Sequence, residues 1–209
     1  ADATVIYAPG MTPLTRVAGR GELRGNSFTF DARRGMVGSV ALSRGEVSIP
    51  VIAPKGRPAY YRFSASGDAG EMVRVLAQEP LAVLKDSGLQ ASQFSGKASV
   101  EAELMRPNLN VAPQESYEYS GTATFSGLGV DGLFGDASLT SGEGELELFT
   151  ESMSVTGNAT VGATPVQIDW RQRFYGDGEK TKIKMSGVAD SATGDFLGVP
   201  SRQFAQGKI

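Results

Sequence analysis

Apolar and polar residues alternate along most of the chain with the period of two that is typical of β-strands. The segment 98–104 is the clearest example, because alanine, valine and leucine alternate there with serine and glutamate. Similar runs lie at 40–42, 47–51, 60–65, 117–125, 137–139, 146–148, 155–157, 166–170 and 183–185. Only one side of each run is apolar, so the pattern predicts an antiparallel sheet with one apolar face.

Short polar segments between these runs carry the residues that favour turns. They lie at 34–35, 43–45, 156–158 and 176–178. The last segment reads Gly-Asp-Gly and separates the strand that ends near Trp170 from the strand at Ile183. It therefore predicts a hairpin with an exposed loop.

One helix is predicted to interrupt the sheet. Asp68 and Glu71 have the spacing of a capping box, and Pro80 stops the helix. A second short turn is predicted at 81–85. The apolar stripe of the first helix should pack on the sheet; it consists of Met72, Val75 and Leu76.

A faint internal repeat relates two segments that lie 120 positions apart (187 minus 67). Residues 61–67, Tyr-Arg-Phe-Ser-Ala-Ser-Gly, are similar to residues 181–187, Thr-Lys-Ile-Lys-Met-Ser-Gly. We therefore predict two units, 1–92 and 93–209, each a β-meander followed by a helix, the second helix being short and near 190–197. Both units are expected to be parts of a longer repetitive protein.

Composition excludes several kinds of chemistry. The chain has 209 residues with neither cysteine nor histidine, which rules out disulfides, Cys/His zinc sites and imidazole-based triads. Its 20 basic and 23 acidic residues give a net charge of −3, which argues against a broad nucleic-acid interface. We expect no metal ion, no cofactor and no nucleic-acid partner.

Two motifs could suggest catalysis or nucleotide binding. Residues 127–132 match G-x-G-x-x-G, but the chain continues as strand and turn instead of opening a helix, so we expect a glycine-rich turn. Glutamates lie in rows at 101 and 103 and at 143, 145 and 147. Both rows lie opposite the apolar residues, so we expect a solvated outer face; an acid pair of the glycosidase type is the alternative.

The apolar face is the most unusual feature, because one short helix is available to cover many strands. A closed barrel or sandwich would cover this face itself, and the residues alone favour that arrangement. The alternative is a curved sheet left partly open, whose lining holds an apolar ligand.

A succession of short sequence motifs shifts the preference from the closed arrangement to the open one. Residues 135–140 read Gly-Asp-Ala-Ser-Leu-Thr and residues 144–148 read Gly-Glu-Leu-Glu-Leu. They are followed by Met-Ser-Val-Thr-Gly-Asn-Ala at 153–159 and Pro-Val-Gln-Ile-Asp-Trp-Arg at 165–171. The succession resembles the central region of the AsmA-like envelope proteins of the YhdP type, in which x-V-x-G-x-A is followed by P-V-x-I-x-W. Gly-Glu-Val-Ser-Ile-Pro at 45–50 fits the same scheme.

The resemblance implies a segment of a large Gram-negative envelope protein, mainly periplasmic and tethered to the inner membrane by a helix outside this segment. It implies a mainly β fold: a strongly curved antiparallel sheet that forms an open, taco-shaped groove, with one or two short helices. The family is implicated in phospholipid transport between the two membranes and in outer-membrane barrier integrity. The partners would be phospholipid acyl chains and the remainder of the longer chain.

We therefore expect a non-enzymatic segment of a bridge-like lipid-transport protein. The alternatives are a closed β-sandwich or solenoid module with a structural or adhesive role, and a carbohydrate-active domain. Headgroups could contact the basic residues Arg171 and Arg173, which could equally be ordinary charges at a sheet edge. The expected groove lining consists of Val100, Leu104, Phe125, Leu139, Leu146, Leu148, Val155, Ile168, Ile183 and Met185.

Overall fold

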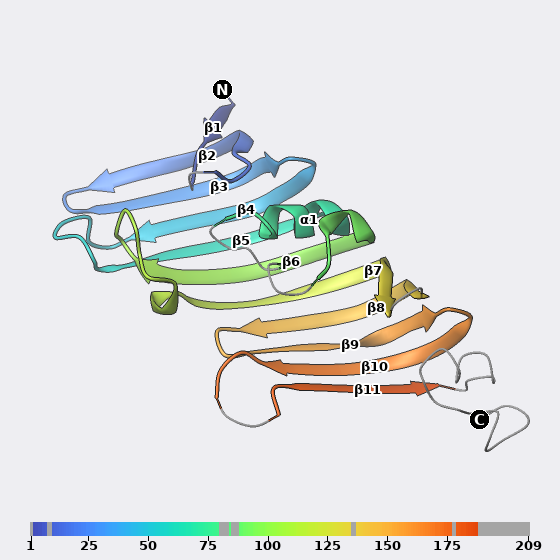
Figure 1. The fold of residues 1–209 in the computed structure, drawn as a ribbon. Coiled ribbons are helices and arrows are strands. Elements are labelled where there is room, and N and C mark those ends of the chain that lie inside the picture. The colour runs from blue at the N-terminus through green and yellow to red at the C-terminus, as the bar shows by residue number, and fades with distance from the viewer. Residues whose placement is uncertain are drawn as a thin grey trace, which may run out of the picture.

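A computed structural model describes residues 2–7, 10–79, 84, 88–134, 137–176 and 179–187. Within these residues, eleven strands form one antiparallel sheet in which each strand pairs with its neighbours in sequence (Figure 1). The sheet is a long meander with β1 and β11 at its two edges. The strands are β1 (Ala3–Val5), β2 (Leu14–Arg24), β3 (Ser27–Val37), β4 (Val40–Ile49), β5 (Pro58–Asp68), β6 (Phe94–Pro107), β7 (Glu118–Phe134), β8 (Ala137–Phe149), β9 (Ser152–Val161), β10 (Thr164–Arg173) and β11 (Thr181–Gly187).

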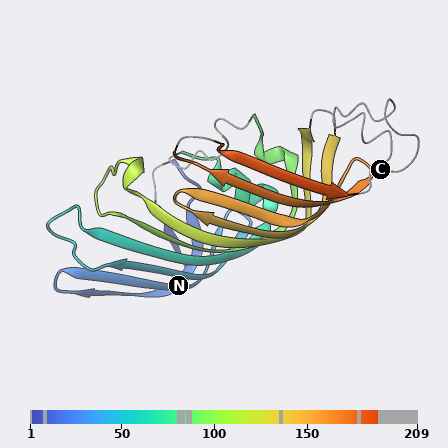
Figure 2. The same ribbon diagram turned by 90° about the horizontal axis from the view of Figure 1, so that it is seen from below.

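The sheet is open, so the closed arrangement that the residues alone favoured is wrong. β1 and β11 do not pair with each other, and the sheet curves across its width (Figure 2). The prediction of a mainly β fold with a curved, open antiparallel sheet is confirmed.

One α-helix, α1 (Ala69–Leu76), follows β5 directly, and two short 3₁₀ turns, η1 (Ala91–Gln93) and η2 (Gln114–Ser116), precede β6 and β7. The Asp68 carboxylate accepts a hydrogen bond from the Glu71 backbone N–H at 3.1 Å, as the capping-box spacing predicts. Figure 2 shows α1 on the concave side of the sheet.

The segment after α1 is tied to the start of β2. The Gln78 side-chain amide donates to the Thr12 hydroxyl at 2.8 Å, and its oxygen accepts from the Thr12 backbone N–H at 2.7 Å. Because these residues are 66 positions apart, the two bonds hold α1 and its C-terminal extension across one end of β2–β5. Of the stripe predicted to pack on the sheet, Met72 and Val75 are half-buried, whereas Leu76 is 42% exposed.

Three segments that the sequence predicts as turns lie inside strands. Residues 34–35 belong to β3, residues 43–45 to β4 and residues 156–158 to β9. In β4 the register shifts between Leu42 and Arg44, which marks a β-bulge in place of a turn. The runs 40–42 and 47–51, predicted as two strands, are therefore largely one bulged strand, β4, which ends at Ile49.

Glycines on the apolar face allow neighbouring backbones to approach closely. Gly144 of β8 pairs with Gly157 of β9, and the Phe125 ring lies beside Gly144. A Cβ atom at Gly144 would collide with the Thr156 carbonyl oxygen, and one at Gly157 with the Glu143 carbonyl oxygen. This pair therefore permits a close approach of β8 and β9 that larger residues would prevent.

The proposed division at residue 92 stays a prediction. β5 and β6 pair along eleven residue pairs, from Pro58 with Pro107 to Asp68 with Lys97, so both predicted units contribute to the same sheet. The repeat-related segments 61–67 and 181–187 lie in β5 and β11. The predicted turn at 81–85, apart from residue 84, and the helix at 190–197 lie outside the described residues.

Candidate functional site

A continuous apolar surface covers one face of the sheet, which we call the apolar face. It is defined by the residues that share a side with Val100 in the strand register. One row across the sheet runs from β4 to β11, each residue paired with the next: Leu42, Ala65, Val100, Ala123, Leu146, Val155, Trp170 and Ile183.

Parallel rows extend this surface along the strands. Paired side chains point to the same face of a sheet, and neighbouring strands lie roughly 4.8 Å apart, so each row offers apolar contacts at close, regular spacing. One of these rows consists of Phe30, Val47, Tyr61, Leu104 and Tyr119, and another of Ala98, Phe125, Gly144, Gly157, Ile168 and Met185.

The register places all ten predicted lining residues on this face. Leu139, at 7% exposure, is buried, Ile183 is 48% exposed, and the other eight are half-buried. In the part of the chain that the structure describes, most of these ten side chains are therefore not covered by a second layer of structure. Whether these residues contact a ligand stays a prediction.

The apolar face is asymmetric along the strands. Near the end of β7 and the start of β8, its side chains are buried in a compact core, against which Phe94, Leu128, Leu133 and Ile168 pack. We call this side the core rim. Its buried residues are Val130, Leu139, Ala159, Val161 and Val166.

The opposite side, where β6 ends and β7 begins, carries tyrosines instead, and we call it the tyrosine rim. Its residues are Tyr61, Arg106, Tyr117, Tyr119 and Tyr175. Tyr61 and Tyr119 each pair with Leu104. Burial raises the pKa of the Tyr119 hydroxyl, and the electrostatic influence of Tyr175 raises it further.

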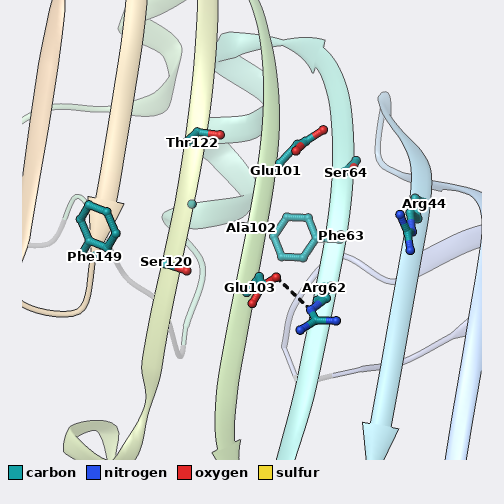
Figure 3. A pocket seen from close by; sticks show the side chains of 11 residues that line it. Arg44, Arg62, Phe63, Ser64, Glu101, Ala102, Glu103, Ser120, Thr122 and Phe149 are labelled. Carbon is teal, nitrogen blue, oxygen red and sulfur yellow. Dashed lines mark ion pairs between the residues drawn. The ribbon is translucent and has the colours of Figure 1, made fainter.

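The other side of the sheet is polar, and we call it the polar face. Glu101, Glu103, Glu145 and Glu147 all lie on it, opposite the apolar rows, as predicted. A shallow depression of about 470 Å³ lies there. Figure 3 shows the residues that line it and the ion pair between Arg62 and Glu103, whose nitrogen and oxygen atoms are 2.9 Å apart. Both side chains are more than half exposed, so the pair contributes little to stability.

Arg171 and Arg173, the predicted headgroup contacts, also lie on the polar face. Arg171 pairs with Ser154 and Lys182, and Arg173 pairs with Ser152, while the Arg171 guanidinium contacts the Asp169 carboxylate at 3.1 Å. Their role stays a prediction, and any headgroup that they bind would lie outside the groove.

The sequence analysis missed two polar groups on the apolar face. Arg106 continues the alternation of β6 beyond Leu104, and this periodicity could have revealed it. The indole Nε1 of Trp170 is buried without a hydrogen-bond partner among the described residues, in the row between Val155 and Ile183.

Among the described residues, no group of three or more acidic side chains has the arrangement of a metal site. None of the helices described is both long and apolar enough to cross a membrane.

Comparison with protein families gives a match over the whole sequence. The family model described as YhdP protein matches residues 1–209. The chain belongs to the YhdP family. Members of the YhdP family are AsmA-like envelope proteins, so the resemblance seen in the sequence is confirmed. No curated protein and no solved structure matches the chain.

Membership of the YhdP family is consistent with the open apolar face described above. The match covers the whole sheet, including β1–β3, for which the sequence pattern predicted no strands. The family match indicates an envelope protein, and the fold of the described residues is an open, curved sheet.

Proposed function

We propose that this chain is a non-enzymatic segment of a bridge-like protein that carries phospholipids between the membranes of the bacterial envelope. The observation that supports this most strongly is the apolar row from Leu42 to Ile183, which crosses eight strands and is largely half-buried. An exposed apolar surface of this length is rare on a monomeric protein without a binding role.

Transport along such a surface would be passive. Each methylene removed from water contributes ~0.8 kcal/mol, so an acyl chain would be held firmly on the apolar face. Successive strands offer similar contacts at a spacing of roughly 4.8 Å, so moving by one strand changes the free energy little. Acyl chains would therefore slide across the strands, from the β1 edge towards the β11 edge or in the reverse direction.

The proposed cellular setting follows from the family. The chain would lie in the periplasm, with an inner-membrane anchor elsewhere in the full protein, and it would support the outer-membrane permeability barrier. Its proposed partners are phospholipid acyl chains and neighbouring segments of its own full-length protein, with no metal, cofactor or nucleic acid.

Native mass spectrometry tests this function directly. The purified chain, incubated with vesicles of phosphatidylethanolamine and phosphatidylglycerol and then separated from them, is expected to retain phospholipid. Fragmentation of the complex should release intact phospholipid masses. A chain that is folded by circular dichroism but takes up no phospholipid would instead support a structural or adhesive module without a ligand.

A further inference from the structure

Arg106 is exceptional in its position on the sheet. Arg106 is the one charged residue among the described residues of β5–β11 that strand pairing places on the apolar face. It pairs with Ala59, which is fully buried, and lies two residues beyond Leu104 at the tyrosine rim. A charge placed at the end of an otherwise apolar face marks the boundary between hydrocarbon contact and water.

The Arg106 guanidinium is held in place but not neutralised. It stacks over the Tyr117 ring at 5.6 Å from the centroid, its Nε donates to the Pro107 carbonyl oxygen at 3.2 Å, and its Nη2 donates to the Leu109 carbonyl oxygen. Arginine has five N–H donors, so three remain after these two bonds. No carboxylate in the described residues forms an ion pair with it.

Tyrosine side chains flank this arginine. Tyr61 and Tyr119 lie on either side of Leu104, in the row next to Arg106. Both are half-buried, and their hydroxyls form no hydrogen bond with another described residue. Tyrosines with an apolar body and a wet hydroxyl are typical of the level at which lipid headgroups meet hydrocarbon.

We propose that the Arg106 guanidinium and the tyrosines of the tyrosine rim bind the phosphodiester group of a phospholipid whose acyl chains lie on the apolar face. The proposal rests on the lipid-carrying function above and adds an orientation to it. Headgroups would lie along the tyrosine rim, and acyl chains would point towards the core rim. A planar guanidinium with free donors is suited to phosphate oxygens.

The dimensions of β6 fit this orientation. One leaflet contributes about 15 Å to the hydrocarbon thickness of roughly 30 Å, and a strand rises ~3.3 Å per residue. A chain anchored at Arg106 would thus extend along about four or five residues of β6. It would pass Leu104 and Ala102 and approach Val100, all of which are half-buried on the apolar face.

Calorimetric titration with short-chain lipids below their micellar concentration tests the proposal. The probes are dihexanoyl phosphatidylglycerol and dihexanoylglycerol, which share acyl chains but differ in the phosphate. Arg106→Gln is expected to weaken binding of the phospholipid roughly tenfold and to leave binding of the diacylglycerol unchanged. Arg106→Lys, which keeps the charge but loses the planar guanidinium with its paired donors, should give an intermediate loss of phospholipid affinity.

The control variant is Arg44→Gln, which removes an exposed arginine from the polar face and should change neither affinity. Because unfolding would abolish binding of both lipids, unchanged binding of dihexanoylglycerol would show that the Arg106→Gln variant remains folded. Equal losses for both lipids, or no loss for either, would overturn the role of Arg106 while leaving lipid binding intact. A wild-type chain that binds neither lipid would contradict the proposed function itself.

Inorganic phosphate distinguishes the two sources of the anion. At millimolar concentration it should displace little dihexanoyl phosphatidylglycerol, because the acyl chains supply most of the affinity. Tight, Arg106-dependent binding of inorganic phosphate alone would assign the site to a free anion and overturn its assignment to a lipid headgroup.

Discussion

Leu146→Asp is expected to abolish phospholipid retention while the chain stays folded. Leu146 lies in the middle of the apolar row, paired with Ala123 and Val155, and it is only half-buried. Water can therefore reach the new carboxylate when lipid is absent. An acyl chain that crossed it would bury an unpaired charge, which costs several kcal/mol and exceeds the ~0.8 kcal/mol that one methylene contributes.

The measurement combines circular dichroism with lipid mass spectrometry on the same preparation. Gln167→Asp is the matched control, since it adds the same charge to the polar face, where Gln167 is exposed and pairs with Asn158 and Ser186. The control should retain wild-type amounts of phospholipid. If Leu146→Asp unfolds, or if it retains as much lipid as the control, the open-groove interpretation of this row is wrong.

Leu139→Ala is expected to destabilise the chain by about 2–5 kcal/mol, the usual cost of truncating a buried leucine. Leu139 is 7% exposed and belongs to the core rim with Val130 and Val161. In a chain of this length, such a loss lowers the melting temperature by roughly 4–20 °C.

Leu146→Ala is the matched comparison, because Leu146 lies on the same strand and the same face but is half-buried. Thermal melts should show a clearly smaller loss for it than for Leu139→Ala. Equal losses at the two positions would mean that the apolar face is a uniform sealed core and not a groove with one packed rim.

The alternation of residues predicted the faces of the sheet well. Val100, Leu146 and Ile168 lie on one face and Glu101 and Glu145 on the other, because a strand that is buried on one side must keep its register. Period-two patterning is a local property, so the sequence shows it without knowledge of the neighbouring strands.

The openness of the sheet could not be read from the same pattern. Leu139 and Leu146 each alternate with polar neighbours in the sequence, yet Leu139 is buried and Leu146 is half-buried. The difference depends on which parts of the chain fold over each row, which is a tertiary property. The family resemblance, and not the alternation, pointed to the open form.

A bulge accounts for one misplaced turn and a close approach of two strands for another. Ser43 lies where the register between β4 and β5 shifts, and a glycine follows two residues later, so the local sequence has the composition of a turn. Gly157, predicted to be in a turn, serves instead for the close approach of β8 and β9. In both cases strand pairing overrides a local turn signal.

Arg106 shows a different limit. Its place at the end of the β6 alternation was visible in the sequence. Its hydrogen bonds to the Pro107 and Leu109 carbonyls and its stacking on Tyr117 form only when the loop after β6 folds back. The more conspicuous pair of arginines in β10 lies on the polar face. Residue type alone therefore does not locate a headgroup contact.

Site-specific photocrosslinking to lipid tests the central claim most directly. A benzoylphenylalanine at position 155 would lie on the apolar face, between Leu146 and Trp170, whereas one at position 156 would lie on the polar face, between Glu145 and Asp169. After exposure to phosphatidylethanolamine and phosphatidylglycerol vesicles and irradiation, we expect a phospholipid adduct at position 155 and little at position 156. Equal labelling at the two positions, or no adduct at position 155 in a folded chain, would contradict the account.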